Sequence, residues 1–567
     1  MKKWKSYSIL FLIMWSTTMT ISAQTTELQQ LTSQLKQLIE PVQTGSSSYK
    51  GGIEEIQPGV LRYVYDETDK KGAVIQYAYE FNLADIDPHA VREVTQKDAI
   101  YTVLAVRNKQ KLVKVYKNNE VQSYNAEVSV IVKDIESARS LSETIKKAIP
   151  HAEKVASARL NLKDYESTIA WICENVKDVS LGTKVYKQTV TQGNHPGVLI
   201  YKEITSDSKS SNEQVYTFNL ADLNAHSLSF KISGSSFTLV METMQKNKYI
   251  AVLNNNESKP YVNSISINTN NVDEARDLKT ALTKVIPLAV EKVKADLPVI
   301  SSEKEGLQKA KDLIIDVNVG AKQISQTLEP NCVCTFIQKE TDSKSTTVEE
   351  YKYNWMDFNP NATSIDVSGD KIFLTLKTMD SKKMVMRNSN EKFNGYDQTV
   401  KIQMADIEKA RRAKVVMDKV IEKCGEAYKT PFNPDLKSAI NWVLENIKET
   451  TLDGVTIVQT FEPVESGKND KFKFTKREIN SKGSGAEELF EFNLANFDPN
   501  SLQVEIKGKW LYVSMETEYK NKIINYYKDG KIQPYTSKLD FAVNDTEIAR
   551  NLIEALKKSI NGVKPKS

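Results

Sequence analysis

One short pattern recurs four times along the 567-residue chain, always at the same distance from a second pattern. The first pattern is an aromatic residue followed by Asn, a large apolar residue and an Asx-rich turn, beginning at Phe81, Phe218, Tyr353 and Phe492. The second is an Ala-Arg pair in a helix-like segment, with the arginines Arg139, Arg276, Arg411 and Arg550. Every Ala lies 57 residues after its aromatic residue, as Phe81 and Ala138 show. A register without gaps over four occurrences indicates repeated folding units.

The repeated patterns divide the chain after residue 23 into four copies. Their predicted ranges are 24–152 (copy 1), 153–294 (copy 2), 295–430 (copy 3) and 431–567 (copy 4). Each range has the length of one ordinary domain. Copy 3 departs most from the pattern, because Trp355 stands where the other copies have Leu.

Each copy is predicted to be an α+β unit with a helix at either end of an antiparallel meander. The opening helix is clearest over residues 169–176 and 440–447, where apolar residues recur at helical spacing. About six segments with alternating or β-branched residues follow, such as 60–65, and polar pairs such as Asn118-Asn119 suit tight hairpin turns. The predicted N-caps of the closing helices are Asp134, Asn271, Asp406 and Asp545. Pro150 and Pro287 are expected to stop or kink two of these helices.

This order of elements resembles pleckstrin-homology-like domains, in four tandem copies. The resemblance covers the sheet and closing helix of each copy, and the helix before the sheet departs from the simplest form of that fold. It implies a barrel or sandwich closed by a C-terminal helix, and lipid or peptide binding is common in that class. No motif matches, so no functional residue is carried over. A helix-grip fold is the alternative.

The N-terminus predicts export from the cell. A basic start (Met1–Lys5), an apolar stretch from Ile9 to Trp15 and a small residue at Ala23 form a signal peptide over residues 1–23, with cleavage after Ala23. The stretch is shorter than the ~20 residues that span a bilayer, although an uncleaved anchor is the alternative. The signal peptide resembles the export signals of Bacteroidota-type bacteria, and the expected location of the protein is periplasmic or extracellular. No transmembrane segment is expected after removal of the signal.

A tyrosine recurs 43 residues after each aromatic anchor. These residues are Tyr124, Tyr261, Tyr396 and Tyr535. They are candidate ligand-facing positions, because a ring on an exposed strand can stack against a ligand. The alternative is a half-buried strand tyrosine whose hydroxyl reaches the surface.

Other polar positions favour structural interpretations. Asp85-Ile86-Asp87 and its counterparts could suggest calcium, but the apolar middle residue predicts a turn whose Asx groups bond to local backbone. His89 and His226 are matched by Asn in the other copies, which is typical of a turn and not of catalysis. The repeated arginines could bind an anion, but acidic neighbours in the same helix favour salt bridges.

Four cysteines occur, at 173, 332, 334 and 424. Export permits one bridge, from Cys334 or Cys332 to Cys424, with Cys334–Cys424 as the named candidate. Four unpaired and partly buried thiols are the favoured alternative.

No catalytic residue, metal site or cofactor is predicted, since no phosphate loop, nucleophile elbow or zinc motif is present. Lys plus Arg (77) nearly balances Asp plus Glu (73), which gives no bias toward nucleic acid. The sequence therefore predicts a secreted, non-enzymatic tandem-repeat protein that binds or scaffolds an unknown envelope protein or surface ligand. The alternatives are a lipid or glycan carrier with pockets in the copies, and a hydrolase with a site between copies that uses His195, Cys332 or Trp355.

Overall fold

The computed structural model describes residues 26–233, 236–465, 470–480 and 482–564. These residues belong to two compact units, unit 1 (Met1–Asp296) and unit 2 (Leu297–Ser567). The predicted signal peptide lies outside the described residues. The described residues form helices and eight antiparallel sheets, which is the predicted α+β class. Within these ranges, no helix combines the length and apolar character needed to cross a membrane.

Copy 1 opens unit 1 with a helix over residues 26–37. Its larger sheet has the order β1 (Val42–Gln43), β2 (Ser47–Gln57), β3 (Val60–Asp69), β4 (Val74–Asn82), β7 (Val113–Lys117) and β8 (Glu120–Asn125). Its smaller sheet has the order β5 (Arg92–Gln96), β6 (Ala99–Ala105) and β9 (Glu127–Val132). The closing helix is α2 (Ile135–Arg159).

Copy 2 completes unit 1 and opens with α3 (Tyr165–Asn175). Its larger sheet contains β10 (Val179–Leu181), β11 (Lys184–Gln192), β12 (Val198–Ser206), β13 (Ser211–Asn219), β16 (Ile250–Asn254) and β17 (Glu257–Val262) in that order. The smaller sheet contains β14 (Ser229–Ser233), β15 (Ser236–Glu242) and β18 (Ser264–Thr269). The closing helix is α4 (Val272–Asp296).

Copy 3 begins unit 2 with α5 (Glu303–Leu313). The larger sheet runs through β19 (Val317–Val319), β20 (Lys322–Leu328), β21 (Val333–Thr341), β22 (Thr346–Asn354), β25 (Val385–Ser389) and β26 (Lys392–Asp397). The smaller sheet runs through β23 (Ser364–Ser368), β24 (Lys371–Lys377) and β27 (Thr399–Met404). The closing helix is α6 (Ile407–Ala427).

Copy 4 begins with α7 (Leu436–Asn446). Its larger sheet follows the path β28 (Thr450–Leu452), β29 (Val455–Pro463), β30 (Lys471–Asn480), β32 (Glu488–Asn493), β35 (Ile524–Lys528) and β36 (Lys531–Thr536), and β31 (Gly483–Ser484) pairs with β30. Its smaller sheet is β33 (Gln503–Lys507), β34 (Trp510–Glu516) and β37 (Lys538–Val543). The closing helix is α8 (Thr546–Val563).

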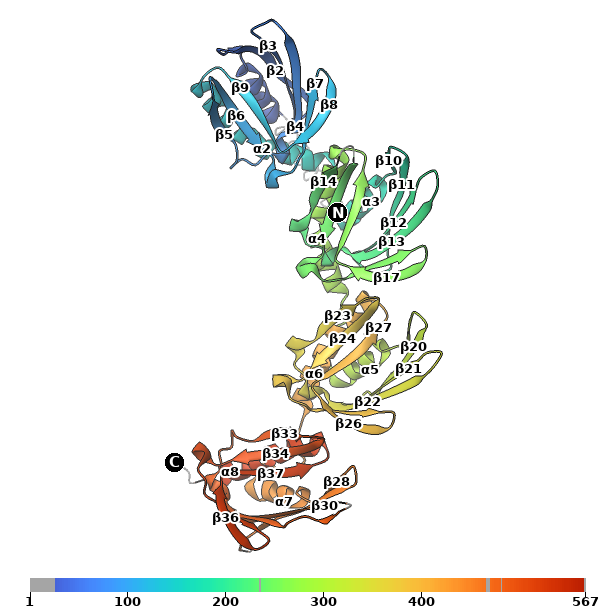
Figure 1. The fold of residues 1–567 in the computed structure, drawn as a ribbon, viewed down its shortest axis with the longest axis vertical. Coiled ribbons are helices and arrows are strands. Elements are labelled where there is room, and N and C mark those ends of the chain that lie inside the picture. The colour runs from blue at the N-terminus through green and yellow to red at the C-terminus, as the bar shows by residue number, and fades with distance from the viewer. Residues whose placement is uncertain (1–25, 234–235, 466–469, 481, 565–567) are drawn as a thin grey trace, which may run out of the picture. The chain divides into compact units, whose positions relative to one another are not determined.

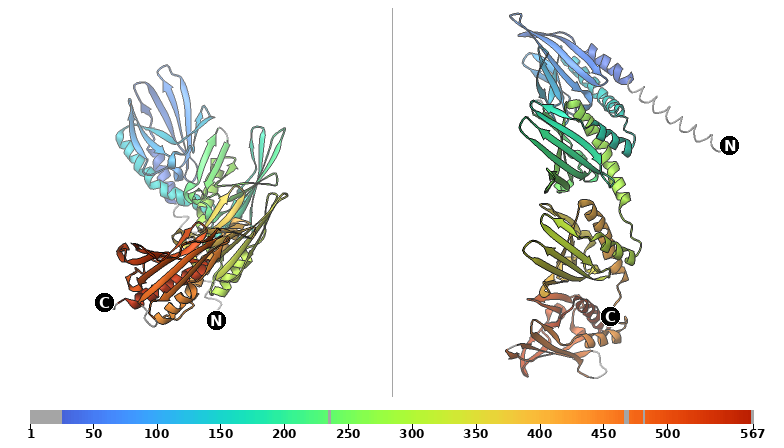
Figure 2. Two further views of the ribbon diagram at one scale, coloured as in Figure 1. Left: turned by 60° about the horizontal axis from the view of Figure 1, so that its bottom comes forward. Right: turned by 90° about the vertical axis from the view of Figure 1, so that its right-hand side faces the viewer.

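The core of each copy lies where the helices meet the two sheets. In copy 2, for example, α3 packs on β11 of the larger sheet, α4 packs on β15 and β18 of the smaller sheet, and the two helices contact each other. Figures 1 and 2 show these helices beside the two sheets of each copy. Buried side chains from all of these elements form one apolar cluster, which is the expected result of amphipathic helices covering a half-apolar sheet.

Buried glutamines tie the two sheets together in copies 2, 3 and 4. The Gln188 side chain donates to the carbonyls of Lys177 (2.7 Å) and Asn268 (3.0 Å), and its Oε1 accepts from the Asn268 amide (3.1 Å). Gln326 and Gln459 make the same three kinds of bond in unit 2. These hydrogen bonds pair backbone amides and carbonyls where the two sheets meet. An unpaired backbone group in the core would cost free energy.

Two closing helices continue through a proline, contrary to the expected stop. Helix α2 runs nine residues beyond Pro150 to Arg159, and α4 runs nine residues beyond Pro287 to Asp296. A proline removes one backbone donor, but Ala148, Ile149 and Ala152 around Pro150 are all buried. Packing against the core therefore outweighs the local penalty.

The predicted caps and hairpin turns are confirmed. Asp134 accepts from the Ser137 amide (2.8 Å), and the other predicted caps accept in the same way. Asn118 and Asn119 both have positive φ, 48° and 64°, which is the backbone of a two-residue hairpin turn.

Candidate binding surfaces

A short 3-10 turn follows the fourth strand along the larger sheet of every copy and presents an acidic or amide side chain at its end. These turns are η1 (Leu83–Asp85), η3 (Leu220–Asp222), η6 (Trp355–Asp357) and η9 (Leu494–Asn496). The next residue is buried in each copy, and the Asx residue after it accepts from local backbone, as Asp87 does from the His89 amide (2.9 Å). The predicted core-plugging turn is confirmed.

In unit 1, Asp85 of copy 1 pairs with Arg276 at the start of the closing helix of copy 2. Two nitrogens of Arg276 donate to the carboxylate, with Nε–Oδ2 at 2.9 Å and Nη2–Oδ2 at 2.6 Å. Arg276 also bonds to Asp273, one turn earlier in α4. Only 12% of each side chain in the cross-copy pair is exposed. Burial alone would lower the pKa of Arg276, but the two carboxylates hold that pKa above its usual value.

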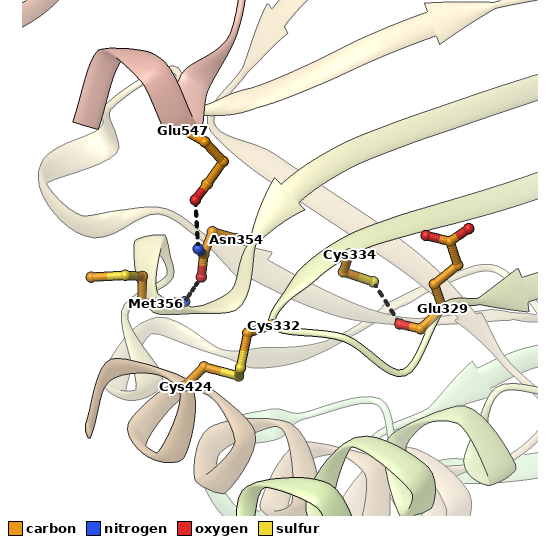
Figure 3. Close-up of a disulfide and its surroundings, with 7 residues drawn as sticks. All are labelled: Glu329, Cys332, Cys334, Asn354, Met356, Cys424 and Glu547. Atoms are coloured by element: carbon orange, nitrogen blue, oxygen red, sulfur yellow. Dashed lines mark hydrogen bonds between the residues drawn. A yellow bond between two sulfur atoms is a disulfide. The ribbon is translucent and has the colours of Figure 1, made fainter. Parts of the chain in front are cut away.

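The same pair occurs in unit 2. Arg550 at the start of α8 in copy 4 holds Asp357 of copy 3 through Nε and Nη2, and it also bonds to Glu547 in its own helix. Both side chains of the cross-copy pair are 10% exposed. Burial raises the pKa of Asp357 to about 6, and the guanidinium opposes that shift. Asn354 adds a bond from its amide to Glu547 (3.1 Å; Figure 3).

Sequence reasoning expected salt bridges at the repeated arginines but found only the partners within the helix. Arg139 and Arg411 do bond to acidic residues of their own helices, Glu136 and Glu408. The cross-copy carboxylates were missed, although a signal was present. The last residue of the turn is Asp in the first three copies and Asn496 in the fourth. The turn is therefore charged in every copy except the last.

The repeated tyrosines lie beside the next copy in each unit. Tyr124 packs edge-on against Phe237 of copy 2, with ring centroids 5.1 Å apart. Tyr396 is buried in the apolar cluster of copy 4. Tyr535 is 54% exposed. The positions that were candidate ligand stacks are thus contact positions between copies at Tyr124 and Tyr396, and whether Tyr261 or Tyr535 contacts a ligand stays a prediction.

The face of copy 4 that carries Tyr535 is apolar and exposed. Ile523 is 46% exposed, whereas its equivalents Leu112 and Met384 are 5% and 6% exposed. The other exposed apolar residues of this face are Tyr519 and Ile532. Tyr519 also has a φ of 57°, which is an unusual backbone conformation for a tyrosine. We call these residues, with Tyr535, the copy 4 face.

Unit 1 contains an open cavity of about 410 Å³ next to the Asp85–Arg276 pair. Val106, Leu112, Leu162 and Phe230 give it apolar walls. Its charged lining residues are Asp85, Arg107, Glu153, Arg276, Lys279 and Lys284. Both carboxylates are held by arginines, Asp85 by Arg276 and Glu153 by Arg107.

The disulfide joins Cys332 to Cys424, with Cα atoms 5.5 Å apart, which is one of the two bridges considered for Cys424. The named candidate, Cys334–Cys424, and the favoured set of four free thiols are wrong. Cys332 lies in the bend just before β21 with its side chain toward α6, whereas Cys334 points away and donates to the Glu329 carbonyl (3.3 Å; Figure 3). Burial raises the pKa of the Cys334 thiol to about 12. In the described part of the chain, the one cluster suited to a metal is Glu303 with the two bridged cysteines, whose sulfurs are not thiolates.

The residues considered for a hydrolase do not come together as a reactive group. Cys332 is in the disulfide, and Trp355 is completely buried. His195 lies in the turn between β11 and β12, where its carbonyl accepts from the Val198 amide (3.1 Å).

Comparison with known proteins adds little to this geometry. No protein-family model matches the chain, and no curated protein matches it. A solved structure that was found is described as PorZ, an essential bacterial surface component of the type-IX secretion system of Porphyromonas gingivalis. It is 7% identical, with 87% of this chain and 80% of that chain covered, and the TM-score is 0.09. That score carries no argument about fold or function.

Proposed function

We propose that the chain is a secreted, non-enzymatic protein of the bacterial cell envelope, in which four tandem copies of one PH-like unit bind or scaffold a protein partner. The repeated patterns in the sequence and the recurrence of the same order of helices and sheets support the tandem architecture. The basic and apolar N-terminus supports export.

The copy 4 face is the observation that carries the binding role. In copies 1 and 3 part of the equivalent face contacts the following copy, since Leu112 and Met384 are buried and Tyr124 and Tyr396 pack against that copy. In copy 4 the positions equivalent to these junction residues, Ile523 and Tyr535, are exposed, as are Tyr519 and Ile532. Exposed apolar patches of this kind mark interaction sites.

The chemistry of this face indicates what kind of protein fits it. The turn that carries Asp85 and Asp357 in the covered copies ends in Asn496 here, so a partner arginine would find no carboxylate. Pro534 lies in the edge strand β36 and blunts it against pairing with another strand. The partner is therefore expected to present an apolar, uncharged surface patch to the side chains of this face.

The test is capture of partners from envelope extracts by the purified chain. The double variant Ile532→Asp and Tyr535→Asp is expected to lose a protein that the wild type captures, and the purified partner should then bind only the wild type in titration calorimetry. Val74→Asp, at another exposed apolar position, is the matched control and should capture normally. Equal capture by the double variant and the wild type would contradict the proposal.

A further inference from the structure

The cavity in unit 1 combines an apolar wall with a concentration of positive charge. Leu112 of copy 1 and Phe230 of copy 2 face it from opposite sides of the junction, and Leu162 lies beside them. Its volume of about 410 Å³ is in the range of small-molecule sites. Figure 1 shows the elements that surround it, α2, α4 and β14, at the meeting of copies 1 and 2.

Among the four cations of the cavity, Lys279 stands apart. Arg276 and Arg107 are each held by a carboxylate, and the Lys284 ammonium donates to the Leu162 carbonyl. Lys279 makes no ion pair with any described residue, and its ammonium lies over the Phe230 ring, 5.0 Å from the centroid. A half-buried ammonium that contacts an aromatic ring and forms no ion pair can still bind an anion, because buried charges are usually paired.

The electrostatic surroundings of Lys279 favour that anion. Burial lowers the pKa of its ammonium, the nearby Arg107 acts in the same direction, and Asp85 opposes them. A carboxylate bound to the Lys279 ammonium would offset both the burial of the charge and the repulsion from Arg107, because its negative charge would lie close to both cations. The charge is thus suited to an anionic guest.

The lysine is particular to this junction. In unit 2 the residue at the same place in the closing helix is Ile553, which packs against the apolar cluster of copy 4. Phe230 is replaced there by Val504, which belongs to the same cluster. The cation and its ring are therefore not a requirement of the junction between two copies.

We propose that this cavity binds a small amphipathic organic anion, a carboxylate on a short aliphatic or aromatic body. The carboxylate lies on Lys279, with Arg107 close by. The apolar body lies against Phe230, Leu112 and Leu162. This site is separate from the copy 4 face and does not depend on it.

Titration calorimetry of the full chain with octanoate and benzoate tests the proposal. Saturable binding of at least one of them with a stoichiometry near one is expected, and 1-octanol and benzyl alcohol, which lack the charge, should bind at least about tenfold more weakly. Absence of binding by both acids, or equal binding of acid and alcohol, would overturn the assignment.

Variants locate the site. Lys279→Met is expected to weaken the acid by about tenfold or more, and Lys279→Arg should retain binding because it keeps the charge. Lys294→Met, on the exposed side of the same helix, is the matched control. Ala156→Trp, which fills the cavity, provides a second and purely steric block. Unchanged affinity in both Lys279→Met and Ala156→Trp, with unfolding transitions like that of the wild type, would place any binding elsewhere.

Discussion

The junction between copies 1 and 2 and the junction between copies 3 and 4 use the same buried ion pair in different surroundings. In unit 1 the Asp85–Arg276 pair borders a cavity that contains Lys279. In unit 2 the Asp357–Arg550 pair lies beside an apolar contact that includes Tyr396 and Ile553. The shared pair therefore defines how a turn meets the next helix, and the variable residues around it decide whether the junction is hollow or filled.

The two junctions also differ in what supports the turn. The η1 turn is held by a bond from the Leu83 amide to the Gly59 carbonyl (2.8 Å), and a Cβ on Gly59 would lie 3.2 Å from that of Ala152. In copy 3 the Trp355 amide bonds to the Cys332 carbonyl (3.0 Å), and Cys332 is bridged to Cys424 of the closing helix. The segment that supports the turn is thus joined to the closing helix by close Gly59–Ala152 packing in unit 1 and by a disulfide in unit 2.

The largest expected effect comes from removing the shared arginine. Arg276→Ala and Arg550→Ala should each lower the free energy of unfolding of their unit by about 3–5 kcal/mol, because a buried carboxylate loses its partner. Urea unfolding followed by circular dichroism measures this. Arg139→Ala is the matched control at the same position in copy 1, where the side chain is 62% exposed, and it should cost less than about 0.5 kcal/mol. A loss at Arg139 equal to that at Arg276 would show that the cross-copy pair is not the cause.

Loss of the disulfide should destabilise unit 2 alone. Cys424→Ser opens a link between residues 92 apart in sequence, which corresponds to about 4 kcal/mol in the chain-entropy model. Chemical unfolding with and without reductant gives the difference. Cys173→Ser, at a free and partly exposed cysteine, should leave both transitions within about 0.5 kcal/mol. If the reductant lowers the stability of unit 1 as much as that of unit 2, the assignment of the effect to this bridge is wrong.

Exchanging the residue that distinguishes the junctions should have opposite effects in the two units. Ile553→Lys buries an ammonium against the copy 4 cluster and should cost about 2 kcal/mol. Lys279→Ile adds apolar surface to the unit 1 cavity and should stabilise that unit by up to about 1 kcal/mol. Thermal unfolding of each variant against the wild type distinguishes them, and destabilisation of unit 1 by Lys279→Ile would mean that the lysine supports the junction itself.

The smallest effect is expected at the exposed edge of the junction between copies 1 and 2, at the Asp277–Arg159 ion pair. Asp277 pairs with Arg159 in unit 1, and its equivalent Asn551 accepts from the Tyr428 hydroxyl in unit 2. Asp277→Asn should cost about 0.5 kcal/mol in low salt and nothing measurable in 1 M salt, because the Arg159 side chain is half exposed. Asn551→Ala should show a loss that is independent of salt. A salt-independent loss at Asp277 would remove this contrast between the junctions.

Local features followed closely from the sequence. The caps at Asp134 and Asp545 and the hairpin pair Asn118-Asn119 were predicted because each depends on neighbours within a few residues. Pro150 did not stop its helix, for the complementary reason. A local rule at Pro150 was overridden by burial of the surrounding helix, which depends on the rest of copy 1.

The candidate sites depended on contacts that no single copy contains. Tyr124 was a candidate ligand-facing residue, with a half-buried strand tyrosine as the alternative. Its ring contacts Phe237 of the following copy, 113 positions further along the chain by their numbers. The pairing of Cys332 and not Cys334 depends on where β21 begins. Cys332 lies in the bend before Val333, outside the strand, and its side chain reaches Cys424 of α6, whereas Cys334 lies in the strand and points away. Spacing in the sequence could not choose between them.

The sequence by itself determined the repeated pattern, the α+β class, and the turns and caps, since these rest on periodicity and on short-range hydrogen bonds. The tertiary structure decided which carboxylate each buried arginine holds, which cysteine is bridged, and where the cavity and the copy 4 face lie. The ion pairs and the disulfide join residues about a hundred or more positions apart, as Arg276 and Asp85 do at a separation of 191. Burial of apolar surface brings such residues together, and the charges and thiols are then paired according to which groups have lost their contact with water.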